Sequence, residues 1–182
     1  MKPRASLVVL VFTLWVMTAL MGCALPMNPG PTPTQRPAVE LATTKPLPPD
    51  RMAATSFIDA DRGWAVGEVA DGGGSLVQRT TDGGRTWEVL YADGAGFPLT
   101  DVCFTDALHG WAVSSSGTLV GNLIATTDGG RTWVEQYGAG PLESVDFSDD
   151  LHGVVRGLDS DSPQRPITLT TNDGGATWSI RR

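Results

Sequence analysis

A repeated eight-residue motif constrains the fold of this chain more than any other feature. Residues 80–87 read T-T-D-G-G-R-T-W, and closely similar letters return at residues 126–133 and 171–178. The aspartates Asp82, Asp128 and Asp173 are 46 and 45 residues apart. Because a fixed period of this size is typical of repeat architectures, the sequence predicts a fold built from small equivalent units.

A second motif recurs in step with the first. It reads F-I-D-A-D-R-G-W-A-V-G from Phe57 and F-T-D-A-L-H-G-W-A-V from Phe104, and more loosely F-S-D-D-L-H-G-V-V-R-G from Phe147. Because the two motifs recur together in a fixed order, we do not expect their similarity to arise by chance. They predict three units, at about residues 53–97, 98–140 and 141–182.

Each unit is expected to hold four short strands separated by turn residues. In the first unit we expect them near residues 53–58, 64–68, 75–80 and 86–91. The two glycines after each aspartate supply the left-handed conformations that a tight hairpin needs. Four antiparallel strands in about 45 residues match one propeller blade. The predicted fold class is therefore all-β and of β-propeller type, with three four-stranded blades in a partial or oligomer-completed propeller.

The aspartate of each repeat has a structural explanation. Its carboxylate can accept N–H bonds from its own turn, while the tryptophan five positions later covers the hairpin. A ligand-binding carboxylate, such as a calcium ligand, is the weaker alternative because each turn contributes only one acid. The predicted structural residues are Asp82, Gly84, Thr86, Trp87, Asp128, Gly130, Thr132, Trp133, Asp173, Gly175, Thr177 and Trp178.

The first residues resemble a bacterial lipoprotein signal. Two basic residues precede an apolar run over residues 7–19, which ends in Gly22-Cys23. The run is shorter than the ~20 apolar residues that span a bilayer. We therefore predict that residues 1–22 are a cleaved signal peptide and that Cys23 carries the lipid. The chain would then be anchored to the cell membrane or outer membrane, facing the periplasm or the exterior. An uncleaved anchor with an incidental cysteine is the alternative.

Residues 23–52 are predicted to be a tether between this anchor and a folded domain over residues 53–182. Eight prolines fall between residues 24 and 52. Proline at this density removes backbone donors and favours an extended chain. The tether is therefore expected to hold the domain away from the membrane.

Charge and cysteine content exclude some partners. The formal net charge is −7, and the leader contains basic residues but no acidic ones, so its removal makes the charge more negative. Nucleic acid is therefore not an expected partner, since phosphate binding needs a basic surface. With Cys23 lipidated, Cys103 is the single free thiol, and we interpret it as a small strand residue.

Two family resemblances follow from the motifs. The T-x-D-x-G-x-T-W element resembles the Asp-box, or bacterial neuraminidase repeat, of sialidases, xyloglucanases and sortilin-type propellers. In those families it is a turn far from the catalytic face, so it implies architecture and not chemistry. The combination of both motifs resembles the photosystem II assembly and stability factor family. This resemblance implies a propeller that binds a protein client, in family members that have more blades.

No catalytic residue, cofactor or metal is predicted, and the chain is predicted not to be an enzyme. Arg85 and Arg131 lie inside the aspartate motifs and form no carboxylate-binding triad. The 20 acidic residues offer many pairs that fit a glycosidase dyad, so that signal has no specificity. His109 and His152 occupy the same turn of different units, and we expect them not to meet at one ion.

Recognition, if present, is expected in the loops that differ between units. Variable loops on a repeated scaffold commonly carry binding residues, whereas ordinary solvated loops are the alternative. The candidate residues in these loops are Asp71, Asp93, Asp159 and Asp161, with Phe97 and Arg165 as possible anchors.

The leading functional hypothesis is a membrane-tethered, non-enzymatic binding or assembly scaffold of the cell envelope, similar to the photosystem II assembly factor. A partial or degenerate glycan-binding or glycosidase-like propeller is the alternative. Because three blades leave two open faces, we also expect a protein partner or self-association, such as a head-to-tail dimer that closes six blades. An open three-blade wedge and a truncated gene are the rival explanations.

Overall fold

The computed structural model describes residues 46–48, 51–69, 74–94, 97–117, 120–138, 140–162 and 165–182. All of them belong to one compact unit, Pro33–Arg182. The regular elements in these ranges are all β-strands. Among the same residues, no helix has the length and hydropathy that a membrane-spanning helix requires.

The strands form three separate four-stranded antiparallel sheets, each built from consecutive strands. The first sheet contains β1 (Met52–Phe57), β2 (Gly63–Glu68), β3 (Ser75–Thr80) and β4 (Glu88–Asp93). The second contains β5 (Leu99–Phe104), β6 (Gly110–Ser114), β7 (Asn122–Thr126) and β8 (Val134–Gly138). The third contains β9 (Leu142–Phe147), β10 (Gly153–Leu158), β11 (Pro166–Thr171) and β12 (Ser179–Arg181). The predicted all-β fold with three four-stranded blades is confirmed.

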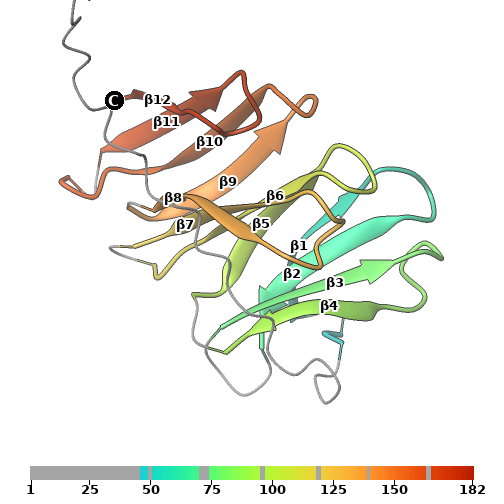
Figure 1. The fold of residues 1–182 in the computed structure, drawn as a ribbon. Coiled ribbons are helices and arrows are strands. Elements are labelled where there is room, and N and C mark those ends of the chain that lie inside the picture. Colours follow the sequence, from blue (N-terminus) through green and yellow to red (C-terminus); the bar gives the residue numbers. More distant parts are fainter. Residues whose placement is uncertain are drawn as a thin grey trace, which may run out of the picture. The chain divides into compact units, whose positions relative to one another are not determined.

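The sheets are arranged as consecutive blades. Their first strands, β1, β5 and β9, lie next to one another, and each second strand faces the first strand of the following blade (Figure 1). Side-chain to backbone hydrogen bonds join the first strands. The amide of Phe104 donates to Ser56 Oγ at 2.9 Å, and the amide of Phe147 donates to Cys103 Sγ at 3.4 Å. Cys103 is thus a link between blades as well as a small strand residue.

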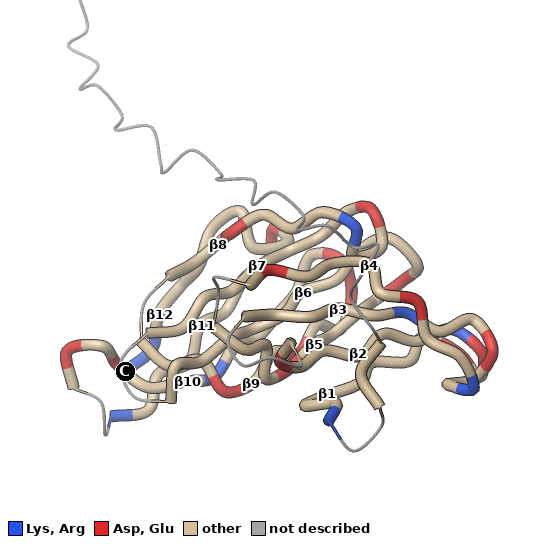
Figure 2. The backbone as a smooth tube through the Cα atoms, turned by 90° about the horizontal axis from the view of Figure 1, so that it is seen from below, with Lys and Arg blue, Asp and Glu red and all other residues tan. Residues whose placement is uncertain are grey.

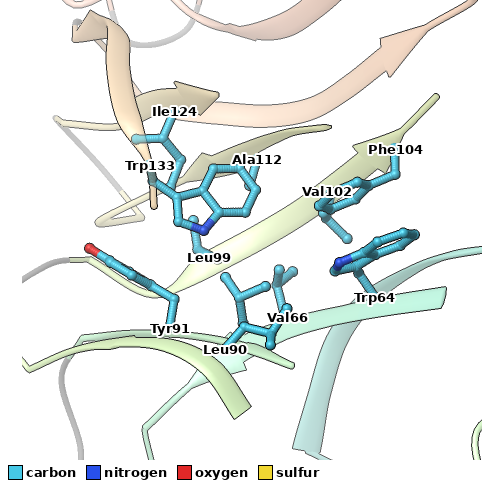
Figure 3. Packing of buried hydrophobic residues seen from close by; sticks show 11 residues of the cluster. Trp64, Val66, Leu90, Tyr91, Leu99, Val102, Phe104, Ala112, Ile124 and Trp133 are labelled. Atoms are coloured by element: carbon cyan, nitrogen blue, oxygen red, sulfur yellow. The ribbon is translucent and has the colours of Figure 1, made fainter. Parts of the chain in front are cut away.

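The hydrophobic core lies between blades. Its first cluster joins Trp64, Val66 and Leu90 of the first blade to residues of the second, among them Phe104 and Trp133 (Figure 3). A second cluster joins the second and third blades in the same way. A blade of this kind buries its apolar faces only against its neighbours, which is the physical reason that the units occur as a series.

The fourth strand of the first blade begins later than the sequence suggests. β4 starts at Glu88, whereas we expected it near residue 86. Thr86 and Trp87 belong instead to the turn, because both are held by bonds to residues 82 and 84. The glycines of this turn have positive φ angles of 71° at Gly83 and 85° at Gly84, as the hairpin requires.

The folded unit also begins earlier than the expected start at Ala53. Leu47, which was assigned to the tether, is 3% exposed. Its amide donates to Gln78 Oε1 at 2.7 Å, and its carbonyl accepts from Gln78 Nε2 at 3.2 Å. Sequence reasoning placed this segment outside the fold because proline density alone does not reveal a single anchored leucine.

Many of the charged residues lie in the turns at the ends of the sheets (Figure 2). The strands between them are largely apolar or uncharged, as in the buried Gly63–Val66 stretch of β2. The scaffold is therefore an apolar stack of sheets with polar ends.

Candidate functional site

The three aspartate turns, residues 80–87, 126–133 and 171–178, are the most regular polar feature of the structure. In the second turn, Asp128 Oδ1 accepts from the Thr126 hydroxyl at 2.8 Å and from the Thr132 amide at 2.9 Å. Asp128 Oδ2 accepts from the Thr132 hydroxyl at 2.6 Å. The Thr126 hydroxyl oxygen in turn accepts from the Gly130 amide at 3.0 Å. One carboxylate thus holds both ends of the turn.

The same bonds occur around Asp82 and Asp173. They stabilise the charged carboxylate and therefore lower its pKa. Bonds from the Thr86 side chain and amide, followed by that from Thr80, lower the pKa of Asp82 to about 2. At Asp128, partial burial acts to raise the pKa, but the bonds from its own turn outweigh burial and lower it. Because both oxygens of each carboxylate accept hydrogen bonds from the turn, these groups are better suited to stabilising the turn than to transferring protons.

The tryptophans of the three turns differ in their surroundings. Trp133 is 1% exposed and donates from Nε1 to the Gly130 carbonyl at 3.0 Å. Trp87 makes the equivalent bond to Gly84 at 3.1 Å but is only partly buried. Trp178 Nε1 is buried without a hydrogen-bond partner. The Gln136 side chain of the second blade donates to the carbonyl of Gly174, the glycine before Gly175, at 2.9 Å.

A second aromatic arrangement links the second and third aspartate turns to the preceding blade. Trp64 of β2 stacks on Phe104 with ring centroids 3.9 Å apart, and its Nε1 donates to the Gly129 carbonyl at 2.9 Å. Trp111 of β6 repeats this against Phe147, at 3.6 Å, with a 3.3 Å bond to the Gly174 carbonyl. Sequence reasoning noted these residues as repeats but missed that they contact the next blade.

The histidine turns come closer together than expected. His109 Nδ1 lies 2.8 Å from Asp106 Oδ2 and 3.7 Å from Asp150 Oδ2 of the next blade. These three residues are near enough for their ligand atoms to share a cation. Burial acts to raise the pKa of Asp106, but bonds from His109 and the Leu108 amide outweigh it and lower the pKa to about 2.

The pairing of a basic side chain with the aspartate of its own turn also occurs in the other two blades, without an acid from a neighbouring blade among the described residues. His152 Nδ1 lies 2.9 Å from both carboxylate oxygens of Asp149 in the third blade. In the first blade, Arg62 Nε donates to Asp59 Oδ2 at 2.7 Å. The shared element is an aspartate that holds its own turn, so the geometry is explained by the turn itself.

The loops that were expected to carry recognition residues are only partly available to a ligand. Asp93 is 9% exposed and Asp159 is 5% exposed. Arg182 Nε pairs with Asp159 Oδ2 at 3.1 Å, which explains how that carboxylate tolerates burial. Phe97, Asp161 and Arg165 are exposed in these loops. Asp71 lies outside the described residues.

Among the described residues, two shallow depressions of about 420 Å³ each include residues of the third blade. One is lined by Thr168, Thr170, Ser179, Ile180 and Arg181 on the outward face of the sheet. The other lies at the histidine turn and is lined by Thr105, Ser148, Asp149, Asp150, Leu151 and His152. The predicted lipidation residue Cys23, with the leader and most of the tether, lies outside the described residues.

Neither protein-family models nor curated proteins gave a match to this chain. Solved structures did. A structure titled "YCF48 bound to D1 peptide" matches with a TM-score of 0.54 and 23% identity, covering 82% of this chain and 43% of that chain. YCF48 from Cyanidioschyzon merolae matches with a TM-score of 0.50 and 22% identity, covering 76% and 39% of the two chains.

The Niastella koreensis GH74 enzyme also matches, with a TM-score of 0.54 and 14% identity over 72% of this chain and 22% of that chain. This chain thus spans less than half the length of each of these three neighbours. At such identities the likeness concerns the fold, and the fold is that of a propeller segment like the one in YCF48.

Proposed function

We propose that this chain is a non-enzymatic protein-binding or assembly scaffold of the cell envelope, tethered to a membrane by lipid on Cys23. The observation that carries the proposal is the propeller similarity to YCF48, one structure of which is described as bound to a peptide. The lipoprotein-like leader and the proline-rich segment supply the tether.

The acidic residues support a structural role over a catalytic one. Bonds within turns lower the pKa values of Asp59, Asp82, Asp106, Asp128, Asp149 and Asp173. A glycosidase acid needs the opposite, a carboxyl group whose pKa is raised so that it holds a proton near neutral pH. These six carboxylates are therefore suited to holding turns.

The test begins with the full-length chain expressed in a bacterial host that is fed an alkyne-labelled fatty acid. We expect label on the wild-type chain and none on the Cys23→Ala variant. Cross-linking in intact cells should then enrich a specific envelope protein with the wild type, and this enrichment should fall in the mislocalised Cys23→Ala variant. Absence of label, or of any specific partner, would argue against the proposal.

The second candidate is a partial glycan-active propeller, which the likeness to the GH74 enzyme favours. Fluorogenic glycosides distinguish it from the scaffold. Hydrolysis that is retained in purified wild-type protein and abolished by changing exposed loop acids such as Asp161→Asn would support this candidate instead.

A further inference from the structure

On the side of the first blade that faces away from the second blade, one phenylalanine is exposed. Phe57 is 46% exposed, whereas its equivalents Phe104 and Phe147 are each 6% exposed. Each of the three rings makes an edge-to-face contact with the tryptophan of its own turn, at 6.2, 6.1 and 6.1 Å. The difference is therefore confined to the side that faces the preceding blade.

The second and third blades show which side chain packs against the equivalent phenylalanine. In the second and third blades, the indole of Trp64 or Trp111 stacks on the phenylalanine and donates to the carbonyl of the first glycine after the aspartate. The first blade presents the same two acceptors, the Phe57 ring and the Gly83 carbonyl. Among the described residues, no side chain stacks on Phe57 or donates to that carbonyl.

Part of the rest of this face is covered. Gln78 stands where Ile124 and Leu169 stand in the interblade cores of the other sheets, opposite Ala65, Ala112 and Val155 respectively. In the first blade this position is covered by Leu47, whose backbone bonds Gln78 on both its amide and its carbonyl. The part that stays open lies along β1, where Thr55 and Phe57 are exposed, and it suits one added strand better than a complete fourth blade.

In a second copy of this chain, the outward face of the third blade lacks the required group. The outward face of the third blade places Val154 at the position of Trp64 and Trp111. Arg156 and Thr168 replace the buried pairs Val66 with Val77 and Val113 with Leu123. A polar outer face is typical of a terminal repeat, and this one offers neither an aromatic ring nor an indole N–H.

We propose that Phe57, Trp87 and the Gly83 carbonyl, here called the aromatic slot, bind a tryptophan side chain that a different protein presents on an extended strand. The indole stacks on Phe57 and donates from Nε1 to the Gly83 carbonyl, as Trp64 does at Phe104 and Gly129. This inference rests on the proposed scaffold function and specifies the chemistry of its partner.

The test uses the full-length protein in detergent and a peptide with the sequence of residues 61–68, which contains the internal tryptophan strand. Backbone amide resonances report binding at each position. We expect the peptide to shift the amides of Phe57, Gly83 and Gly84, and the matched peptide carrying Trp64→Val to leave them unchanged. In the protein, Phe57→Leu should weaken binding by about tenfold or more, because the stacking surface is lost.

Ile180→Leu is the matched control, since Ile180 is also 46% exposed but lies in the third blade. Its binding should equal that of the wild type. Equal shifts with the two peptides, no shift at all, or a wild-type dimer that Phe57→Leu dissociates would each overturn the proposal. Any of these results leaves the fatty-acid labelling of Cys23 unaffected, so this inference and the tethered-scaffold proposal fail separately.

Discussion

At the scale of single residues, the aspartate of each turn has the largest local role. Asp128 accepts bonds from two hydroxyl groups and two backbone amides of its own turn. Each of these donors would be left without its partner if the carboxylate were removed. The aspartate is therefore expected to matter for stability more than its partial exposure suggests.

We predict that Asp128→Ala lowers the free energy of unfolding by about 1.5–3 kcal/mol, the range for losing hydrogen bonds to a charged group. Urea denaturation followed by tryptophan fluorescence measures this change. Asp61→Ala is the control, since Asp61 is exposed and its carbonyl, not its carboxylate, bonds Gly83. Equal destabilisation by both substitutions would show that the turn network is not the cause.

The same carboxylates predict how stability depends on pH. Asp82 and Asp106 have pKa values lowered to about 2, against ~3.9 in an unfolded chain. A lowered pKa in the folded state means that these groups stabilise the fold above pH ~4 and lose that contribution as the pH falls toward 2. We expect a falling melting temperature across this window in a thermal titration. Asp106→Asn should make the fall shallower, and an unchanged slope would contradict the assignment.

The residue patterns in the sequence predict part of the turn structure. They placed the aspartates and tryptophans in turns, because the Asp-Gly-Gly run needs backbone angles that glycine supplies. They did not predict the contact of Trp64 with Phe104, although both letters recur in every strong copy of the second motif. Periodicity locates equivalent positions, but it does not say whether a side chain packs within its own unit or against the next one.

At the scale of elements, β2 and β6 act as connectors as well as strands. Each carries one tryptophan that contacts the following blade. β10 has no such tryptophan, because Val154 occupies the equivalent position. The strand boundaries themselves were within a few residues of those expected from turn residues. The larger miss was Leu47, whose burial depends on one distant glutamine that no local pattern reveals.

Trp64→Val is expected to cost about 3 kcal/mol, since it removes a buried aromatic side chain together with its stacked ring contact. Chemical denaturation of the purified protein measures the loss. Val154→Ala serves as the control on the equivalent strand position, where the side chain faces outward, and it should cost much less. A Trp64→Val protein as stable as wild type would refute the interblade role.

Gln78→Ala should release the segment around Leu47. Its amide loses the 2.7 Å bond to Gln78, so hydrogen exchange at Leu47 is expected to accelerate by about tenfold or more, with a stability loss of about 1–3 kcal/mol. Gln136→Ala is the comparison, because it removes a glutamine-to-backbone bond between the second and third blades instead. Unchanged exchange in Gln78→Ala would mean that the segment is held by other contacts.

At the scale of the whole folded unit, the two terminal blades are not alike. The first blade keeps an open aromatic slot beside a covered patch, whereas the third presents threonine and arginine where the first and second blades present apolar residues. This asymmetry favours an open series of three blades over a ring closed by two copies. The sequence alone left both arrangements open, because the meaning of Val154 and Gln78 depends on which faces they occupy.

Val154→Trp should change this asymmetry. It gives the third blade the group that the aromatic slot accepts, so we expect self-association at least about tenfold stronger than in the wild type, measured by sedimentation velocity. Adding Phe57→Leu should reverse the gain. Ser160→Trp adds an exposed tryptophan in a loop and is the control for non-specific hydrophobic association. Equal self-association of that variant would contradict a specific pairing of the tryptophan introduced by Val154→Trp with the aromatic slot.

The placement of Cys103 between the first strands of two blades has a chemical consequence. The thiolate is the form that attacks oxidants and disulfides. Burial, followed by the neighbouring charges of Asp146 and Asp101, raises the pKa of Cys103 despite the opposing bond from the Phe147 amide. The sulfur therefore stays protonated at neutral pH and is a poor nucleophile. Burial between two blades thus keeps this thiol unreactive, although the hydrogen bond that joins the blades acts in the opposite direction.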